Sequence, residues 1–169
     1  MTLQRTHVAS GSPYEPEIGF CRALRVGDRV LVSGTAPVWP DGSCDPDPGA
    51  QARRCLEIVL AALAEVDAGP EQVIRTRMFL TDAADWEAVG RAHGDVFGTV
   101  RPAATMVVVA RLLDPRWRVE IEAEALAGIG AGGGDPGVAA PAAPDAAPSE
   151  IRSVPVAHRQ AGHGGAEGR

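Results

Sequence analysis

The stretch at residues 101–126, RPAATMVVVARLLDPRWRVEIEAEAL, decides the fold because it reads as two strands of different character. The first, at 104–112, holds three consecutive valines at 107–109, and Pro102 just before it disfavours a helical start. The second, at 118–126, alternates strictly between apolar and charged residues. Its apolar face carries Val119, Ile121, Ala123 and Ala125, and its charged face carries Arg118, Glu120, Glu122 and Glu124. This pattern predicts a sheet that helices cover on one side.

The charged face of the second strand is unusually acidic. Its three glutamates, Glu120, Glu122 and Glu124, fall within about 14 Å, at roughly 3.4 Å per residue. Carboxylates this close repel one another unless cations, hydrogen bonds or open water meet them. An acidic face on an otherwise apolar strand is therefore the first indication of a site.

Five further elements are predicted upstream of these two strands. They are strands at 20–26 and 29–35 joined by a Gly27-Asp28 turn, an amphipathic helix at 50–66, a strand at 73–81, and a helix that Thr81 or Asp82 can cap and that ends near Gly98. The predicted order is ββαβαββ. It is typical of an α+β sandwich with two helices on one face of the sheet.

The opposite face of this sheet is expected to be uncovered. It combines apolar side chains with charged ones, namely Leu31, Phe79 and Met106 beside Arg77 and Glu120. Apolar surface of this extent is rarely left to solvent, so we expect the chain to oligomerise through this face.

Strict periodicity also assigns faces to individual side chains. It places Thr35 with Leu31 on the uncovered face, Ile74 on the covered face, and Trp86 in the core. His93, on the second helix, is interpreted as a solvated or hydrogen-bonded residue rather than a catalytic one.

Composition excludes several classes of function. The 169 residues suffice for one domain with a real core, and the formal charge of −6 argues against a nucleic-acid partner. The chain contains no lysine, which excludes a Schiff-base amine, a pyridoxal phosphate anchor and a P-loop cation. Cys21, Cys44 and Cys55 form no CxxC pair and are odd in number, so neither a disulfide framework nor a zinc site is encoded. We expect no cofactor and no metal.

The local amino-acid composition of the chain predicts three regions. Residues 1–17 are polar and turn-rich and are expected to form an arm, residues 18–127 form the domain, and residues 128–169, rich in Gly, Ala and Pro, are expected to be a disordered tail. No run is long and apolar enough to span a bilayer, and the first residues lack the design of a signal peptide. The expected location is the cytoplasm.

Six segments together resemble the Rid/YjgF superfamily of reactive-intermediate deaminases. They are VGDRVLVSGTAPV, AQARRCLEIVLAAL, VIRTRMFLTD, DWEAVGRAHGDVFG, RPAATMVVVARL and VEIEAEA, and the resemblance covers residues 18–127. It implies a chorismate-mutase-like α+β fold and a homotrimer with clefts between subunits. It also implies hydrolysis of enamines and imines, such as 2-aminoacrylate, to a keto acid and ammonia.

The resemblance also implies roles for individual residues. Glu120 matches the glutamate that handles water, Ser33 matches a serine of the early strand, and Thr105 matches the hydroxyl beside an arginine that clamps the substrate carboxylate. The arginine position itself is occupied by Ala104. The chain therefore resembles a branch without this arginine, and standard 2-aminoacrylate deamination is not expected. A tyrosine position of the family falls near Phe20 or Cys21.

Each remaining candidate has an alternative. Arg101 and Arg77 are the arginines best placed to replace the missing clamp, or they are solvated or bridge an interface. Cys21 lies in the cleft, where it binds substrate or acts as a nucleophile, or it is a small buried strand residue. Glu120 is a general base, or it is a structural carboxylate paired with Arg77 or Arg118 at the subunit interface.

Two functions follow. The first is an enzyme that hydrolyses or tautomerises a reactive imine or enamine at an intersubunit cleft. In this hypothesis Glu120 activates the water or transfers the proton. The second is a non-catalytic metabolite-binding or assembly module. The expected partners are a small-molecule substrate and two further copies of the chain, with no nucleic acid and no membrane.

Overall fold

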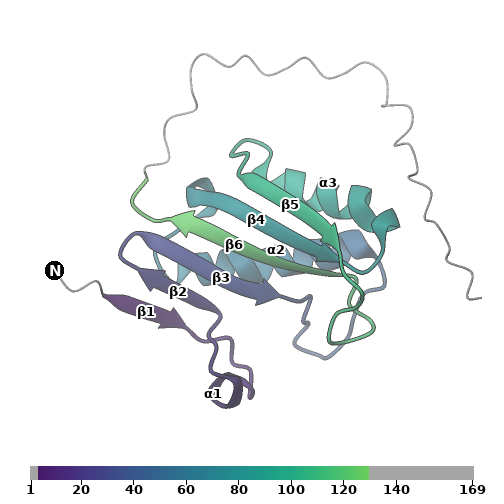
Figure 1. Cartoon of the computed structure of the whole chain (residues 1–169), viewed down its shortest axis with the longest axis horizontal. Helices are drawn as coiled ribbons and strands as arrows, with labels where there is room; N and C mark the ends of the chain where they lie inside the picture. The colour runs from purple at the N-terminus through teal and green to yellow at the C-terminus, as the bar shows by residue number, and fades with distance from the viewer. Residues whose placement is uncertain (1–3, 130–169) are drawn as a thin grey trace, which may run out of the picture. The chain divides into compact units, whose positions relative to one another are not determined.

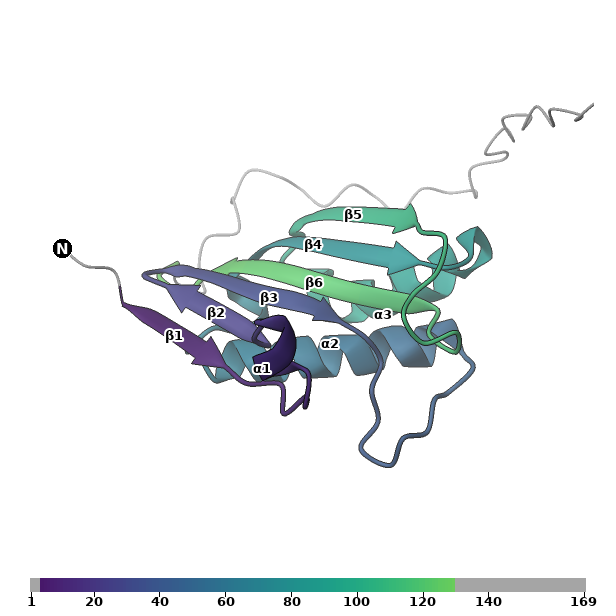
Figure 2. The ribbon, with the colours of Figure 1, turned by 60° about the horizontal axis from the view of Figure 1, so that its bottom comes forward.

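Six strands form one mixed sheet in the order β1-β2-β3-β6-β4-β5, and two long helices lie on one of its faces (Figures 1 and 2). The computed structural model describes residues 4–129. The strands are β1 (Arg5–Val8), β2 (Ala23–Val26), β3 (Arg29–Thr35), β4 (Val73–Leu80), β5 (Ala103–Val108) and β6 (Val119–Leu126), and the helices are α1 (Glu15–Ile18), α2 (Pro48–Ala64) and α3 (Trp86–Phe97). Short 3-10 turns, Pro70–Gln72 and Ala83–Asp85, precede β4 and α3. The predicted α+β sandwich is confirmed.

Residues 5–8, assigned from composition to an N-terminal arm, instead form the edge strand β1. They pair with β2 in antiparallel register, and Val8 is the one buried side chain of the four. A strand that buries a single side chain has no apolar alternation to reveal it. The predicted ββαβαββ order is thus preceded by one strand and the short helix α1. The predicted tail lies, beyond Ile129, outside the described residues.

The core is built between α2, α3 and the covered face of the sheet. The Asp47 carboxylate accepts a hydrogen bond from the Ala50 amide at 2.6 Å and starts α2, and Pro48 occupies its first turn. The largest fully buried apolar side chains are Phe97, Leu56, Leu63, Leu80, Ile121, Val30, Val59, Val89 and Val119. None of the helices within residues 4–129 is both long and apolar enough to cross a bilayer.

Two bulges overturn predicted faces. The register of β3 against β6 shifts between Val32 and Thr35, so Thr35 turns into the core and is 0% exposed. The register of β4 against β6 shifts between Val73 and Arg75, and this leaves Ile74 38% exposed. An extra residue in one strand reverses the side-chain alternation beyond it, and therefore both predictions from strict alternation are wrong.

Two further predictions are corrected at the β4–β5 side of the sheet. Met106 pairs with the buried Met78 in the parallel β4–β5 ladder and packs against the core, so it is not on the uncovered face. Trp86, which was predicted to lie in the core, is 52% exposed. It is the first residue of α3, and the buried residues of this helix begin at Val89.

The start of β6 is anchored by both long helices. Buried Gln51 of α2 accepts a hydrogen bond from the Arg118 amide at 2.7 Å. Both carboxylate oxygens of Asp85, the residue before α3, accept from the Arg118 guanidinium, at 2.7 Å from Nε and 2.8 Å from Nη2. Glu120 follows two residues later, so these contacts fix the strand that carries it.

The imidazole of His93 lies between α3 and the sheet, with Nε2 2.9 Å from Thr76 Oγ1. This confirms the interpretation of His93 as a hydrogen-bonded residue. Burial lowers the pKa of His93 from its ordinary value of 6.5. The unfolded chain therefore takes up a proton at His93 as the pH falls below about 6.5, and the folded chain does so only at lower pH. The free energy of unfolding should decrease over that range.

We expect His93→Gln to reduce this acid-dependent loss of stability. The measurement is urea unfolding at several pH values between about 7 and 5. His7→Gln, on the exposed edge strand β1, is the matched control. If His93→Gln and wild type lose stability equally on acidification, then His93 does not contribute to the loss.

Candidate functional site

The three glutamates of β6 lie on the uncovered face, as the alternation predicts. Every second residue of β6 is buried beneath the sheet, and Glu120, Glu122 and Glu124 are half-buried between β3 and β4. Glu120 pairs across the ladder with Phe79, and Glu122 with Arg77.

Two of the three glutamates are neutralised by arginines. Arg77 forms a hydrogen-bonded ion pair with Glu122 and lies 3.4 Å from Glu124 Oε1. Arg29 donates to Glu124 Oε2 at 3.0 Å, and this hydrogen bond is the main cause of the lowered pKa of Glu124. Arg77 is therefore paired within one copy, and its partners are Glu122 and Glu124 rather than Glu120.

Glu120 is different from its neighbours. Within residues 4–129 its carboxylate has no hydrogen bond and no ion pair within 4.0 Å, so within one copy it pairs with neither Arg77 nor Arg118. None of the buried polar side-chain atoms in this range lacks a partner, so the oxygens of Glu120 must reach solvent. Burial and then the charge of Glu122 raise the pKa of Glu120, against the opposing charge of Arg22. A half-buried, unpaired carboxyl of this kind can accept and return a proton.

Gly34 lies directly beneath the Glu120 carboxylate. A Cβ at residue 34 would overlap Glu120 Oε1. Gly34 belongs to the bulge of β3, and its lack of a side chain is what lets Glu120 lie against the backbone there.

Arg22 also contacts Gly34 and was not among the predicted residues. Its Nη1 donates to the Gly34 carbonyl at 3.2 Å and to Thr35 Oγ1 at 2.8 Å. Counting back from the predicted Gly27-Asp28 turn would have paired Arg22 with Ser33, and the Ser33 amide indeed donates to the Arg22 carbonyl at 3.0 Å. The hairpin register is therefore the sequence feature that could have identified Arg22 as a neighbour of the predicted site residue Ser33.

Ser33 and Cys21 lie at the same end of the sheet. Ser33 Oγ donates to the Cys21 carbonyl at 2.7 Å, and both residues are half-buried. The structure thus brings together Glu120, Ser33 and Cys21 of the predicted site, and adds Arg22.

Thr105 and Arg101 are separated from this group within one copy. Thr105 lies on β5 and pairs with Arg77 of β4. Because β5 is two strands from β6, about 10 Å separates β5 from β6. Arg101 lies before β5, at the end of the sheet that is distant from Glu120, and donates from its amide to the Phe97 carbonyl at 2.8 Å. Ala104 pairs with buried Thr76 and faces away from Thr105.

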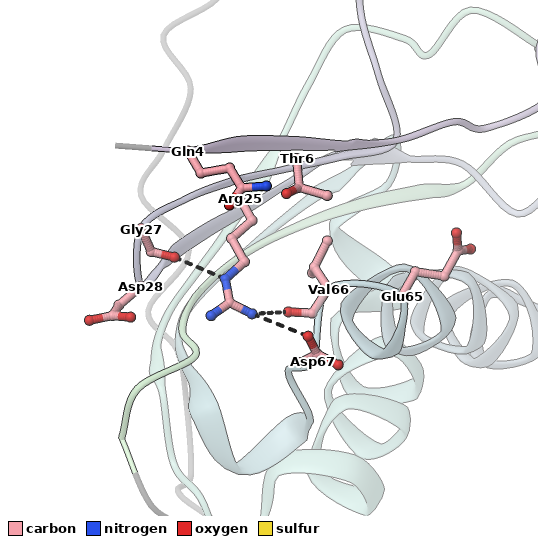
Figure 3. Close-up of a pocket in the computed structure, with 8 residues that line it drawn as sticks. All are labelled: Gln4, Thr6, Arg25, Gly27, Asp28, Glu65, Val66 and Asp67. Atoms are coloured by element: carbon pink, nitrogen blue, oxygen red, sulfur yellow. Dashed lines mark hydrogen bonds and ion pairs between the residues drawn. The ribbon is translucent and has the colours of Figure 1, made fainter. Parts of the chain in front are cut away.

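A separate polar hollow of about 470 Å³ lies at the opposite edge of the sheet, between β1, β2 and the C-terminal end of α2 (Figure 3). Its central side chain, Arg25, donates to the Gly27 carbonyl at 2.9 Å and to the Val66 carbonyl at 2.6 Å. The Oδ2 atom of Asp67 lies 3.7 Å from Nη1 of Arg25. These contacts tie the end of α2 to the β2–β3 turn, a structural role for Arg25.

Comparisons with known proteins agree with this architecture. A family model described as endoribonuclease L-PSP matches residues 11–127. The chain is 43% identical to an uncharacterized protein of Streptomyces coelicolor, over 72% of this chain and 91% of that one. It is 33% identical to the 2-iminobutanoate/2-iminopropanoate deaminase of Salmonella typhimurium, over 64% and 85% respectively.

A solved structure gives the same result. A member of the YjgF/YER057c/UK114 family from Mycobacterium tuberculosis superposes with a TM-score of 0.68 and 40% identity, over 73% of this chain and 99% of that one. The resemblance found in the sequence is confirmed. This chain therefore belongs to the endoribonuclease L-PSP family, the YjgF or Rid family.

Proposed function

We propose that this protein hydrolyses or tautomerises a small reactive imine or enamine, with Glu120 as the proton-transferring group. The observation that carries the proposal is that Glu120 alone, of the three glutamates of β6, has no ion pair within the part of the chain that the structure describes. Partial burial of an unpaired carboxylate lowers the free energy of unfolding, and no contact of this carboxylate within residues 4–129 offsets that loss. The deaminase name of the Salmonella relative supports the reaction class.

The reaction needs one group that exchanges a proton in both directions. In imine hydrolysis, the Glu120 carboxylate removes a proton from water as the water oxygen bonds to the C=N carbon. The protonated carboxyl then gives that proton to the nitrogen, which leaves a carbinolamine. A second transfer through Glu120, from the carbinolamine hydroxyl to the nitrogen, lets the C–N bond break to give a carbonyl compound and ammonia or an amine. In enamine tautomerisation, the protonated carboxyl gives a proton to the enamine carbon, and the resulting carboxylate takes up the N–H proton as the C=N bond forms. A raised pKa brings both forms of Glu120 closer to neutral pH.

We propose further that the site is completed between subunits of a homotrimer. Glu120 lies two strands away from Thr105 in one copy, and Ser33 and Cys21 lie further still, so a cleft containing both groups requires a second copy. The uncovered face supports this assembly, because it presents Leu31, 37% exposed, and Val107, 42% exposed, beside the charged side chains.

The preferred substrate is expected to differ from 2-aminoacrylate. Ala104 supplies no guanidinium, and Arg77 is held by Glu122. A carboxylate clamp through two charge-assisted hydrogen bonds is therefore absent from β5.

A substrate panel tests the function. Imines and enamines would be generated in solution by an amine or amino-acid oxidase, and release of carbonyl product and ammonia would be measured with and without the protein. Light scattering after gel filtration would give the assembly mass. We expect catalysis on part of the panel, a negligible rate on 2-aminoacrylate, and a mass of three chains. Binding without turnover across the panel would instead support the metabolite-binding module, and a monomer would exclude the intersubunit site.

A further inference from the structure

The guanidinium of Arg22 and the carboxylate of Glu120 meet at one backbone position. Arg22 Nη1 is bonded to the carbonyl of Gly34, and Glu120 Oε1 lies against the Cα of the same residue. Arg22 is the residue just before β2, and Glu120 belongs to β6. In the sheet, β3 lies between β2 and β6. A cation and a carboxyl from different strands are therefore held on one rigid bulge.

Most of the hydrogen-bonding capacity of Arg22 is unused. Its two internal acceptors, the Gly34 carbonyl and Thr35 Oγ1, both bind Nη1. Within residues 4–129, Nε and Nη2 have no acceptor, and because no buried polar side-chain atom there lacks a partner, both nitrogens must contact solvent. Nε–H and Nη2–H form one edge of the guanidinium, the geometry that binds a carboxylate or carbonyl group in a bidentate manner.

Arg22 and Glu120 do not neutralise each other. No ion pair within 4.0 Å joins them, although Arg77 and Arg29 pair closely with the other two glutamates of the face. Burial lowers the pKa of Arg22, and the charges of Glu15 and then Glu120 oppose this. Because an arginine stays protonated in proteins, its partly desolvated charge gains more from a bound acceptor than a fully hydrated one would.

We propose that Arg22 holds a carboxylate or carbonyl group of the substrate through its Nε–Nη2 edge, and so places the reacting carbon beside Glu120. This inference rests on the proposed function. It names the substrate class as small imines or enamines that carry a second, acceptor group. β2 and β5 lie on opposite sides of β6 in the sheet, so the acceptor enters from the β2 side rather than from the strand that carries Ala104.

Probe binding tests the role of Arg22 without requiring turnover. The full chain, labelled with ¹⁵N, would be titrated with sodium butyrate, with butyramide and with sodium chloride, while the arginine Nε–Hε resonances are followed by NMR. The Arg22 resonance is identified by its absence in Arg22→Gln. We expect a saturable shift with butyrate, a weaker one with butyramide, and none with chloride.

Variants separate a binding role from a structural one. Butyrate affinity should fall at least tenfold in Arg22→Gln and by less in Arg22→Lys, which keeps the charge but loses the bidentate edge. It should be unchanged in Arg91→Gln, a matched control whose arginine is 71% exposed on α3. With a turnover substrate, Arg22→Gln should raise KM more than it lowers kcat.

The outcomes distinguish the two proposals. If the Arg22 resonance does not respond to butyrate, or if Arg22→Gln and Arg22→Lys both bind butyrate as wild type does, the role of Arg22 is overturned even where catalysis is observed. If butyrate binds at Arg22 but no member of the substrate panel turns over, the role of Arg22 stands and the enzymatic function fails. Gel filtration and thermal unfolding of each variant exclude misfolding, and Arg22→Lys keeps the test valid if Arg22→Gln does not fold.

Discussion

Replacing Glu120 with glutamine is expected to lower kcat on the preferred imine or enamine by about 10²- to 10⁴-fold, the usual contribution of a positioned general acid or base. Glutamine preserves the size of the side chain and its position over Gly34 but cannot exchange a proton. Steady-state kinetics and light scattering would be measured on the same preparation. We expect an intact trimer with lost turnover.

Glu87→Gln is the matched control for this substitution. Glu87 is exposed on α3 and pairs only loosely with Arg91, at 3.5 Å, so its loss should leave turnover unchanged. A Glu120→Gln variant with wild-type turnover would remove Glu120 from the chemistry. A variant that loses both turnover and the trimer would identify Glu120 as a structural carboxylate.

Glu120→Gln also has a pH signature in stability. The pKa of Glu120 is raised above 4.5 in the folded chain, so the folded state holds this proton more tightly than the unfolded state. Ionised Glu120 therefore destabilises the fold once the pH exceeds the folded pKa, and the two states are protonated alike well below 4.5. Glutamine should therefore raise the melting temperature near pH 7, and this gain should vanish as the pH falls below about 4.5.

Replacing Asp85 with alanine is expected to lower the free energy of unfolding by about 2–3 kcal/mol. Breaking a buried ion pair by removing one partner typically costs about 3–5 kcal/mol, and the partial exposure of Arg118 reduces that figure. The loss comes from the bidentate contact to Arg118, because the Asp85 side chain makes no capping hydrogen bond at the start of α3. Because Arg118 lies at the entrance to β6, we also expect a lower kcat.

Asp82→Ala provides the comparison for Asp85→Ala. Asp82 is more exposed, lies 3.7 Å from Arg118 Nη2 and caps the Ala84 amide at 2.9 Å, so its loss should cost only about 1 kcal/mol. Denaturant unfolding at a fixed protein concentration measures both variants. Equal losses for the two variants would mean that the Asp85–Arg118 contact contributes little beyond capping.

The fold was largely predictable because its central strands carry a strong period-2 signal. Alternation in β6 placed all three glutamates correctly, since helices bury one face of that strand and leave the other open. Alternation failed at Thr35 and Ile74, where a bulge inserts a residue that no apolar pattern marks. It failed at Met106 because the register of a parallel pair depends on the long connection between the strands.

The site was only partly predictable for a similar reason. Glu120 came from an acidic face and a family resemblance, and its lack of an ion pair is visible only once Arg77 is seen to pair with Glu122. Arg22 was missed because it carries no motif, although the hairpin register of the strand predicted at 20–26 pointed to it. The roles of Ser33, Cys21, Thr105 and Arg101, and the trimer itself, remain predictions.

Gly34 gives access to selectivity without altering any charge. Because nothing but a hydrogen atom separates its Cα from the carboxylate above, an added methyl group would displace the Glu120 carboxylate while leaving the ionisable groups intact. Redesign of the proposed substrate preference could therefore begin at residue 34, where one small substitution changes the position of the Glu120 carboxylate.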